Sequence, residues 1–366
     1  MTVGIVGAGQ LGRMLALAGY PLGIDFLFLD PADEPPAAQL APHLHGSFTD
    51  RRLLRTLARR SEVVTFDWEN VSVEALRALH KDVRICPPLA ALAASQDRVS
   101  EKRLFERLRI PTTRWRAVDS LLQLERAVRD IGLPGVLKTR RLGYDGKGQA
   151  VLESAADIER AWHELGETGL LYEERIAFTH EVSIIGARSA SGEVAVYPLS
   201  GNVHSQGILR LTRAPYGPTA WQKLANRYLT RVLEHFRYVG ILAIEFFVQR
   251  GRLLANEMAP RVHNSGHWTI EGAATSQFEN HLRAILALPL GSTRPLGYSA
   301  MVNLIGRMPP RKELLAFRGL HLHDYAKAPR PGRKLGHCTL VARTRGERDR
   351  WARGMLATLA PNTRIP

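Results

Sequence analysis

Apolar positions recur along the first third of the chain in two alternating patterns. Short runs rich in Val, Ile, Leu and Phe predict buried strands over Val3–Val6, Asp25–Leu29 and Glu62–Phe66. Apolar residues spaced three or four apart predict helices over Arg13–Ala18, Arg51–Arg59 and Val73–Leu79. Strands that alternate with helices are typical of a parallel α/β sheet. Cys86-Pro87-Pro88 punctuates the end of this unit.

A helix and a compact mixed unit follow in the middle of the chain. We expect Ser95 to cap the helix, whose apolar side carries Val99, Leu104, Phe105 and Leu108, and Pro111 to stop it. Helices and strands then alternate over 121–131, 135–138, 149–152, 155–165 and 170–174, with a glycine loop between the first two strands. From Glu181 onward the expected strands are longer and the hairpins tighter. The pattern predicts three units: a Rossmann-like unit over 1–96, a small central unit over 97–178 and a larger rear unit over 179–366.

Composition limits the class of protein. The 366 residues are 45% hydrophobic and 23% charged, which fits a soluble globular protein of two or three domains. No apolar run approaches the roughly 18 residues of a membrane span, and the N-terminus carries no basic leader, so we expect no membrane segment and no signal peptide. Two distant cysteines, Cys86 and Cys338, suit a reducing compartment, and we expect a cytoplasmic protein.

The charge balance is strongly basic. A formal net charge of +15 raises the alternative of a nucleic-acid partner. The positive charge is scattered, however, and much of it lies on expected helix surfaces such as that of Arg51, Arg52 and Arg55. No basic stripe is interleaved with aromatic residues. The charge pattern therefore favours a generally basic surface with a few anion sites over specific nucleic-acid binding.

A glycine motif follows the first expected strand. Gly7-Ala8-Gly9-Gln10-Leu11-Gly12 matches G-x-G-x-x-G, in which backbone amides approach a phosphate at a helix N-terminus. Asp30 stands about twenty residues further on, where a dinucleotide enzyme places the acid that binds a ribose. An NAD-dependent oxidoreductase and a tight turn that only packs a helix on a strand both fit this motif.

Two further features indicate a phosphate site. Lys138 ends the apolar strand Gly135–Leu137, and a lysine delivered by a buried strand is unusual unless it meets an anion. The loop Gly143-Tyr144-Asp145-Gly146-Lys147-Gly148 follows, and its glycines allow a flap to fold over phosphates. Glu173 and Glu174 end another expected strand. Glu181 begins the next strand, where an acid can accept hydrogen bonds from two ribose hydroxyls. The alternative for Glu181 is a solvated carboxylate at the edge of the sheet.

The strongest signal from the residues themselves is a pair of glutamates. A hairpin centred on Gly251 places Gln249 opposite Leu253 and Glu245 opposite Glu257, with Cβ atoms roughly 5 Å apart. Two carboxylates that close repel each other unless a cation or a proton intervenes, and oxygen ligands beside a phosphate site suit Mg²⁺. The alternative is a protonated or arginine-paired glutamate. Strict alternation points Asn256 to the other face, so a role for it requires a local bulge.

Two polar segments complete the candidate site. The loop from Pro260 to Trp268 leaves the second glutamate strand and is dense in donors for anions, and His263 suits a base, a hydrogen-bond donor or a structural histidine. Near the end of the chain, Lys327, Arg330, Arg333 and Lys334 surround Pro331-Gly332. A basic turn of this kind is a solvated face or, with its rigid geometry, a phosphate contact.

Together these residues resemble the ATP-grasp superfamily and, within it, the N5-carboxyaminoimidazole ribonucleotide synthases of bacterial purine biosynthesis. The resemblance runs nearly end to end. It is carried by GQLGRM at 9–14, GYDGKGQ at 143–149, NEMAPRVHNSGHWT at 256–269 and RPGRKLGH at 330–337. It implies an ATP-grasp architecture with a Rossmann-like N-terminal domain, a central lid and a C-terminal catalytic domain. Leu142 and Asp67 depart from the family pattern, since a glycine often precedes the loop and a longer acid often stands beside Glu69.

The resemblance also implies ligands and residue roles. The implied ATP site comprises Arg98, Lys138, Gly143, Tyr144, Asp145, Gly146, Lys147, Gly148, Gln149, Glu173, Glu174, Arg175, Ile176, Glu181, His204, Asn256 and Glu257. Mg²⁺ falls on Glu245 and Glu257. The ribonucleotide falls on Gly9, Gln10, Leu11, Glu69, Lys327, Arg333 and Lys334, and the catalytic set is Tyr144, Asp145, Lys147, Arg261, His263 and Asn264. The implied substrates are ATP, bicarbonate and aminoimidazole ribonucleotide, and the implied assembly is a homodimer.

The implied reaction is carboxylation through carboxyphosphate. Bicarbonate attacks the γ-phosphate of ATP, carboxyphosphate breaks down to CO₂ and phosphate, and the 5-amino group of aminoimidazole ribonucleotide captures CO₂. A formate-dependent transformylase, another ATP-grasp purine enzyme, is the nearest alternative, although we would not expect it to carry the turn at 330–337.

Overall fold

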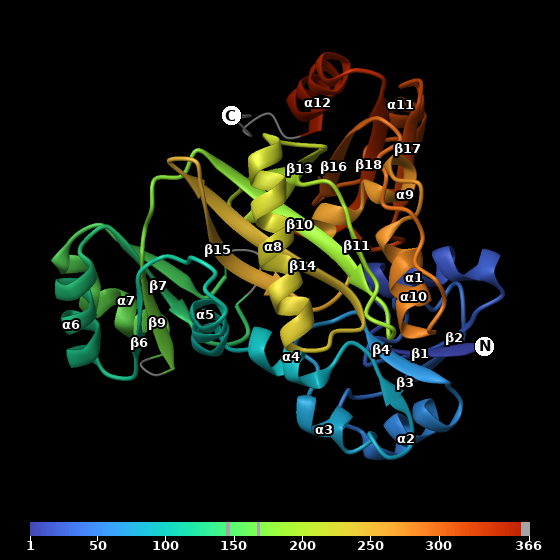
Figure 1. Cartoon of the computed structure of the whole chain (residues 1–366), viewed down its shortest axis with the longest axis horizontal. Helices are drawn as coiled ribbons and strands as arrows, with labels where there is room; N and C mark the ends of the chain where they lie inside the picture. Colours follow the sequence, from blue (N-terminus) through green and yellow to red (C-terminus); the bar gives the residue numbers. More distant parts are fainter. Residues whose placement is uncertain (144–146, 167–168, 360–366) are drawn as a thin grey trace.

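The computed structural model describes residues 1–143, 147–166 and 169–359. The chain folds into three sheets that follow one another along the sequence (Figure 1). The predicted α/β class is confirmed. None of the helices within the described ranges is long and apolar enough to cross a membrane.

The first sheet is parallel, with five strands in the order β3-β2-β1-β4-β5. Its strands are β1 (Thr2–Val6), β2 (Asp25–Asp30), β3 (His43–His45), β4 (Val63–Phe66) and β5 (Arg84–Ile85). Its helices are α1 (Gln10–Gly19), η1 (Tyr20–Leu22), α2 (Arg51–Arg59), α3 (Val73–Arg77) and α4 (Leu89–Ser95). Because β1 and β4 are parallel neighbours, the loop after β1 and Asp67 after β4 meet at one edge of the sheet.

The helix α5 (Arg98–Arg107) corrects the predicted cap. The predicted cap Ser95 is wrong, because Ser95 is the last residue of α4 and its hydroxyl donates to Leu92 O (3.0 Å). Asp97 caps α5 instead, and its carboxylate accepts from the amides of Val99 and Ser100 at 3.0 Å. The helix ends at Arg107, and the left-handed residue Arg109 (φ 54°) follows it before Pro111.

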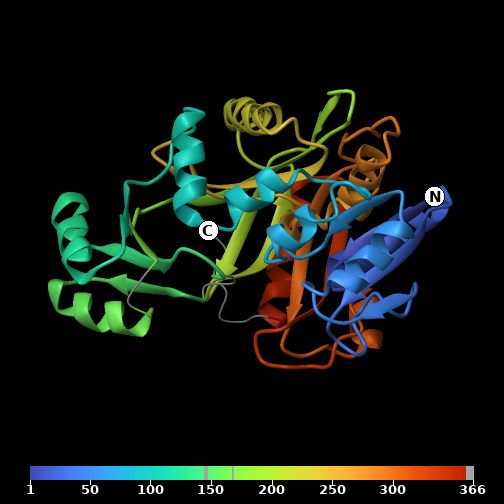
Figure 2. The same cartoon turned by 90° about the horizontal axis from the view of Figure 1, so that it is seen from below.

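The second sheet is small and antiparallel, with strands in the order β6-β9-β7-β8. Its elements are β6 (Trp115–Val118), α6 (Leu121–Ile131), β7 (Gly135–Thr139), β8 (Gln149–Leu152), η2 (Ala155–Asp157), α7 (Ile158–Glu164) and β9 (Leu170–Glu174). This unit has its own core, which includes Leu124, Leu137 and Tyr172. It projects from the rest of the molecule at the left of Figures 1 and 2. A separate core is what a unit needs to move as one body.

The third sheet has nine strands. Its path is β15-β14-β10-β12-β13-β16-β18-β17, and β11 pairs with β10. The strands are β10 (His180–Arg188), β11 (Val194–Val196), β12 (Ser200–Ser205), β13 (Ile208–Ala214), β14 (Gly240–Gln249), β15 (Arg252–Ala259), β16 (Tyr298–Ile305), β17 (Leu320–Asp324) and β18 (Lys334–Ala342). The helices are α8 (Thr219–His235), η3 (Asn264–Gly266), α9 (Thr269–Gly272), α10 (Gln277–Ile285), α11 (Arg311–Leu315) and α12 (Arg345–Leu359).

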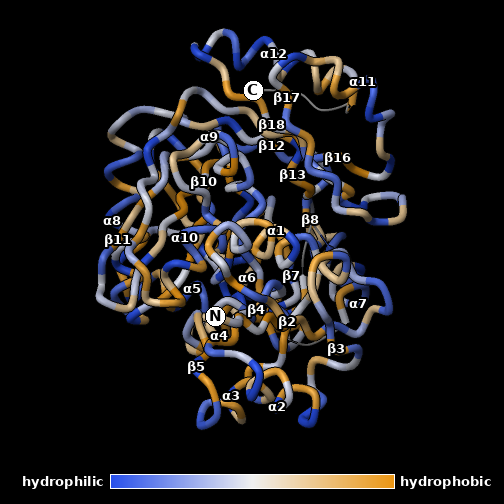
Figure 3. The backbone as a smooth tube through the Cα atoms, turned by 90° about the vertical axis from the view of Figure 1, so that its right-hand side faces the viewer, coloured by the Kyte–Doolittle hydropathy of each residue, from blue (hydrophilic) through white to orange (hydrophobic). Residues whose placement is uncertain are grey.

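The first and third sheets share one hydrophobic core. Ile5, Met14 and Phe28 of the front unit pack in the same buried cluster as Trp268 and Phe278 of the rear unit. Hydrophobic and hydrophilic stretches alternate along the whole chain, with hydrophilic stretches conspicuous on α12 (Figure 3). The N-terminal unit with the first sheet and the rear unit with the third sheet therefore form one packed body, and the small unit with the second sheet projects from it.

The hairpin β14–β15 brings the two glutamates together by a route that the sequence did not predict. The predicted register was one residue off: Gln249 pairs with Arg252 around a two-residue turn, in which Arg250 and Gly251 have φ of 49° and 76°. A β-bulge at Asn256 then shifts the pairing by one residue, so that Glu245 still lies opposite Glu257. The predicted pair is confirmed, and Asn256 lies at a local bulge of the kind that a role for it would require.

Candidate active site

One cavity of about 1430 Å³ joins all three units. Its wall is formed by the hairpin β14–β15, the glycine loop that follows β1, strand β7 with Lys138, and the basic turn after β17, which contains Lys327, Arg330, Arg333 and Lys334. Of the residues proposed from sequence, it gathers Gly9, Gln10, Leu11, Glu69, Arg98, Lys138, Gly143, Lys147, Gln149, Glu181, His204, Glu245, Asn256, Glu257, Arg261, His263, Asn264, Lys327, Arg333 and Lys334.

A few proposed residues lie elsewhere. Glu173 is buried behind Lys138, Glu174 pairs with Arg114 (3.0 Å), and Arg175 pairs with Glu153. Ile176 is buried beside them, and Gly148 follows the loop with a left-handed φ of 69°. Tyr144, Asp145 and Gly146 lie outside the described residues.

The glutamate pair and the bulge form a cluster of oxygen donors. Burial first, then the charge of Glu257, raises the pKa of Glu245 to about 7, although His204 opposes the rise. Across the bulge, Asn256 Oδ1 is buried and accepts no hydrogen bond from any group that the structure describes. Glu257 also pairs with Arg98 (3.4 Å), as the alternative of an arginine-paired glutamate required. A carboxylate whose ionisation is disfavoured by a neighbouring carboxylate, beside an unsatisfied carbonyl oxygen, still suits a cation at this place.

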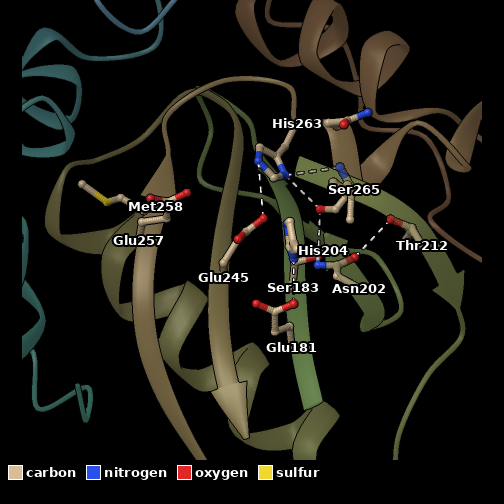
Figure 4. Close-up of polar contacts among 12 residues, drawn as sticks. Glu181, Ser183, Asn202, His204, Thr212, Glu245, Glu257, Met258, His263 and Ser265 are labelled. Carbon is tan, nitrogen blue, oxygen red and sulfur yellow. Dashed lines mark hydrogen bonds and ion pairs between the residues drawn. The ribbon is translucent and has the colours of Figure 1, made fainter. Parts of the chain in front are cut away.

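A chain of hydrogen bonds fixes the orientation of His263 (Figure 4). Thr212 donates to Asn202 (3.1 Å), Asn202 to Ser183 (3.0 Å), and Ser183 to Ser265 (2.8 Å). Ser265 contacts His263 Nδ1 through its hydroxyl (2.9 Å) and its amide (3.3 Å).

The same contacts fix the tautomer of His263. Because a backbone amide can only donate, Nδ1 of His263 is an acceptor and the proton of the neutral ring is on Nε2. That nitrogen lies 3.6 Å from Glu245 Oε1. Burial and the charges of Arg261 and Lys334 hold the pKa of His263 well below its ordinary value, so the ring is uncharged.

His204 and Glu181 form an ion pair on neighbouring strands. Nδ1 of His204 lies 2.7 Å from Glu181 Oε2. Burial disfavours the charged ring, but the hydrogen bond to Glu181 and the charges of Glu245 and Glu257 prevail and raise the pKa of His204 to about 9. The cavity therefore holds a cationic imidazole at neutral pH, on the wall next to the carboxylates.

The front glycine loop wraps around an internal carboxylate. Asp67 Oδ2 accepts from the amides of Gly9 (2.7 Å) and Gly12 (3.0 Å), and a Cβ on Gly7 would lie 1.7 Å from Asp67 Oδ1. Asp30 accepts from the amide of Ala8 (2.8 Å). The groups that would hold a pyrophosphate and a ribose in a dinucleotide enzyme therefore bind each other, which disfavours the NAD interpretation.

The basic turn faces this loop. Lys327 donates to Gln10 Oε1 across the cavity, and Arg261 pairs with Glu69 at 2.8 Å. Burial, with the charges of Arg333, Lys334 and Arg330, lowers the pKa of Lys327 to about 8, while Asp67 opposes the change. Neighbouring cations that disfavour the protonation of Lys327 indicate a site that is stabilised by an anion.

Sequence reasoning assigned no role to three charged groups around the site: Asp67, Glu101 and Lys102. Glu101 accepts from the amide of Met258 (2.6 Å), and Lys102 contacts Glu173 (3.0 Å). A signal was present, because Glu101 and Lys102 share a helix face with the apolar Phe105. Charged residues on the buried face of a helix indicate buried partners.

The chain matches three family models in succession. Residues 1–96 match the "Ribonucleotide synthetase preATP-grasp domain", residues 103–278 the "ATP-grasp domain", and residues 299–350 the "Phosphoribosylaminoimidazole carboxylase C-terminal domain". The fold and the cavity thus belong to an ATP-grasp enzyme.

Relatives narrow the class further. The chain is 51% identical over 340 residues to N5-carboxyaminoimidazole ribonucleotide synthase of Pseudomonas aeruginosa, covering 93% of this chain and 94% of the relative. It is 42% identical over 357 residues to the Vibrio cholerae enzyme of the same name, covering 96% and 93%. The chain belongs to the N5-carboxyaminoimidazole ribonucleotide synthase family.

Solved structures agree with this family. The N5-carboxyaminoimidazole ribonucleotide synthetase of Thermus thermophilus superposes with a TM-score of 0.94 at 49% identity, covering 100% of this chain and 99% of that one. The Aspergillus clavatus synthase in complex with ADP and 5-aminoimidazole ribonucleotide superposes with a TM-score of 0.92 at 32% identity, covering 98% of each chain. The predicted enzyme is confirmed as an ATP-dependent ligase of purine biosynthesis that carboxylates aminoimidazole ribonucleotide.

Proposed function

We propose that the single cavity carries both halves of the carboxylation, with ATP and Mg²⁺ between the small sheet and the hairpin β14–β15, and with the ribonucleotide between the front loop and the basic turn. The observation that supports this most directly is the continuity of the cavity from Lys138 to Lys334. An intermediate that forms at one end therefore has a continuous path to the other end within one cavity.

The ATP end is defined by charge. Lys138 and Arg98 suit the phosphates, and Glu181 and the cationic His204 line the same wall. Glu245, Glu257 and the unsatisfied oxygen of Asn256 would hold Mg²⁺, which usually takes one or two carboxylates together with substrate phosphates. An ion held there would supply positive charge next to the phosphates. Side chains of the protein would provide the rest of the stabilisation and would orient the substrates.

Transfer of the γ-phosphoryl group to bicarbonate requires positive charge around the equatorial oxygens. Lys138 supplies it from one side and Arg261 from the other, where Glu69 (2.8 Å) holds the guanidinium in place. His263, fixed as the Nε2–H tautomer, presents a donor rather than a base. Carboxyphosphate then breaks down to CO₂ and phosphate, and the 5-amino group of the ribonucleotide attacks the CO₂ carbon and loses a proton.

The ribonucleotide end holds the 5′-phosphate. Among the residues that the structure describes, the amides of Gln10 and Leu11 have no hydrogen-bond partner, and they open the N-terminus of α1. A helix end carries only about half an elementary charge, which is too little for a dianion. Lys327, Arg333 and Lys334 supply the cations from the opposite wall.

The experiment that tests this proposal is phosphate release from ATP. We expect release to depend on Mg²⁺ and to rise strongly when bicarbonate and aminoimidazole ribonucleotide are both present. Stimulation by formate and glycinamide ribonucleotide instead would assign the chain to the transformylases.

Three wider features rest on the family resemblance. We propose a cytoplasmic homodimer in which residues 97–178 form the lid and residues 179–366 the catalytic domain. Light scattering at micromolar concentration measures the assembly, and a monomeric mass would contradict the dimer.

A further inference from the structure

A buried lysine stands behind the ATP site, outside the wall of the cavity. Lys102 lies on α5 and is 3% exposed; its partner Glu173 lies on β9 and is equally buried. Glu173 also pairs with Lys138, which reaches the cavity from β7. One carboxylate is therefore shared between two lysines, and only one of these lines the cavity.

Donor counting shows that Lys102 is charged. Its Nζ contacts Thr112 Oγ1 (2.7 Å), Thr113 Oγ1 (3.0 Å) and Glu173 Oε2 (3.0 Å). The hydroxyl of Thr112 donates to Ala255 O (2.8 Å) and that of Thr113 donates to Glu173 (2.8 Å). Both hydroxyls can therefore only accept from Nζ, and three donated bonds require an ammonium group. All three of its protons are engaged within the protein.

Glu173 divides its two oxygens between the lysines. Oε2 accepts from Lys102 and Thr113, whereas Oε1 faces Lys138. The nearby carboxylate of Glu101 accepts from the amide of Met258 (2.6 Å) instead and forms no ion pair with either lysine among the described residues. Two ammonium groups and one carboxylate leave one net positive charge, and Lys138 is the member that reaches the cavity.

We infer that Lys102 is a positioning residue for ATP: it is the permanent counter-ion of Glu173, which leaves the charge of Lys138 available to a phosphate. The inference rests on the proposed ATP site. Without Lys102, Glu173 and Lys138 would form a closed neutral pair, and phosphate would have to compete with the carboxylate for the same ammonium group. Such competition weakens ATP binding while the pocket keeps its shape.

The test is a double-mutant cycle on KM for ATP. Lys102→Met lowers the net charge of the cluster to zero and should raise this KM about tenfold or more, as expected for a weakened charge-assisted bond. In the Glu173→Gln background the same substitution should change KM less than about threefold, because no carboxylate remains to neutralise Lys138. KM for aminoimidazole ribonucleotide should stay within about threefold throughout. A purely structural role for Lys102 would raise KM equally in both backgrounds, which would overturn the inference.

Matched variants separate the possible causes. Arg103→Met removes the same charge from the exposed side of the same helix and should leave both KM values unchanged. Lys138→Met tests the ATP site itself. An unchanged KM for ATP in Lys138→Met would refute the proposed ATP site. A raised KM for ATP in Lys138→Met, together with an unchanged KM in Lys102→Met, would refute only the inference about Lys102. If Lys102→Met does not fold, Lys102→Gln removes the same charge but keeps a donor for the threonine hydroxyls, and it should also raise KM for ATP but not for the ribonucleotide. No change in KM for ATP in a folded Lys102→Gln variant would overturn the inference.

Discussion

Replacing Glu181 by Gln should remove a pH-dependent contribution to stability. Glutamine is nearly isosteric and still accepts the hydrogen bond from His204, so the change deletes mainly the charge. The folded protein raises the pKa of His204 from its ordinary value of 6.5 to about 9, and both side chains are less than a quarter exposed. A rise of this size corresponds to about 3 kcal/mol.

The sign of the effect follows from the raised value. The folded state binds the proton of His204 more tightly than the unfolded chain does, so the contribution is fully present below pH 6.5 and disappears as the pH rises through 9. In Glu181→Gln the pKa of His204 should fall toward its ordinary value or below it, because burial then acts with one opposing charge fewer.

Urea unfolding between pH 6 and 9.5, in EDTA to exclude divalent ions, measures the difference. At pH 6 the wild type should exceed the variant by about 2–3 kcal/mol, and the gap should close by pH 9.5. Asp119→Asn is the control, because it breaks an ion pair with Arg140 (3.1 Å) that contains no histidine. Parallel stability curves for the wild type and Glu181→Gln would refute the assignment of a charged His204.

Further predictions concern the ligand sites. Glu257→Gln should abolish turnover and Glu245→Gln should impair it severely, and near-normal kcat at ordinary Mg²⁺ in either variant would contradict the metal site. Arg333→Ala and Lys334→Ala should each raise KM for aminoimidazole ribonucleotide about tenfold or more, with KM for ATP nearly constant in steady-state kinetics. Asp67→Ala should lower the free energy of unfolding by about 3–5 kcal/mol, since two amides lose an ionised acceptor, whereas Asp67→Asn should cost much less in the same urea titration.

Local signals in the sequence predicted much of the fold. The bounds of α2, α6, β8 and β9 agree with the predicted ranges, because side-chain caps such as Asp50 and apolar periodicity act within a few residues. The cap of α5 was wrong where Ser95 and Asp97, both good caps, compete within three positions. Which of the two residues caps α5 depends on how α4 packs against its neighbours, and the local sequence pattern carries no information about that packing.

In the candidate site, too, local features could be predicted from the sequence, whereas contacts between distant segments could not. The Glu245–Glu257 pair was predicted although the turn was one residue too long, because the bulge at Asn256 compensates for the shorter turn. Simple alternation cannot place such a bulge. The sharing of Glu173 between Lys102 and Lys138 joins α5, β7 and β9, which lie far apart in the sequence, and only the assembled structure reveals it.

The loop around Asp67 bears on how far a glycine motif identifies a ligand. The three motif glycines make room for a carboxylate of the same polypeptide, and the acceptor of the Gly9 and Gly12 amides is therefore covalently attached to the protein. To engineer this loop to accept a dinucleotide, the side chain of Asp67 would first have to be replaced by a smaller one. In chains that carry G-x-G-x-x-G after a strand, the residue that ends the neighbouring parallel strand is worth inspecting first, because an acid there can satisfy the motif from within.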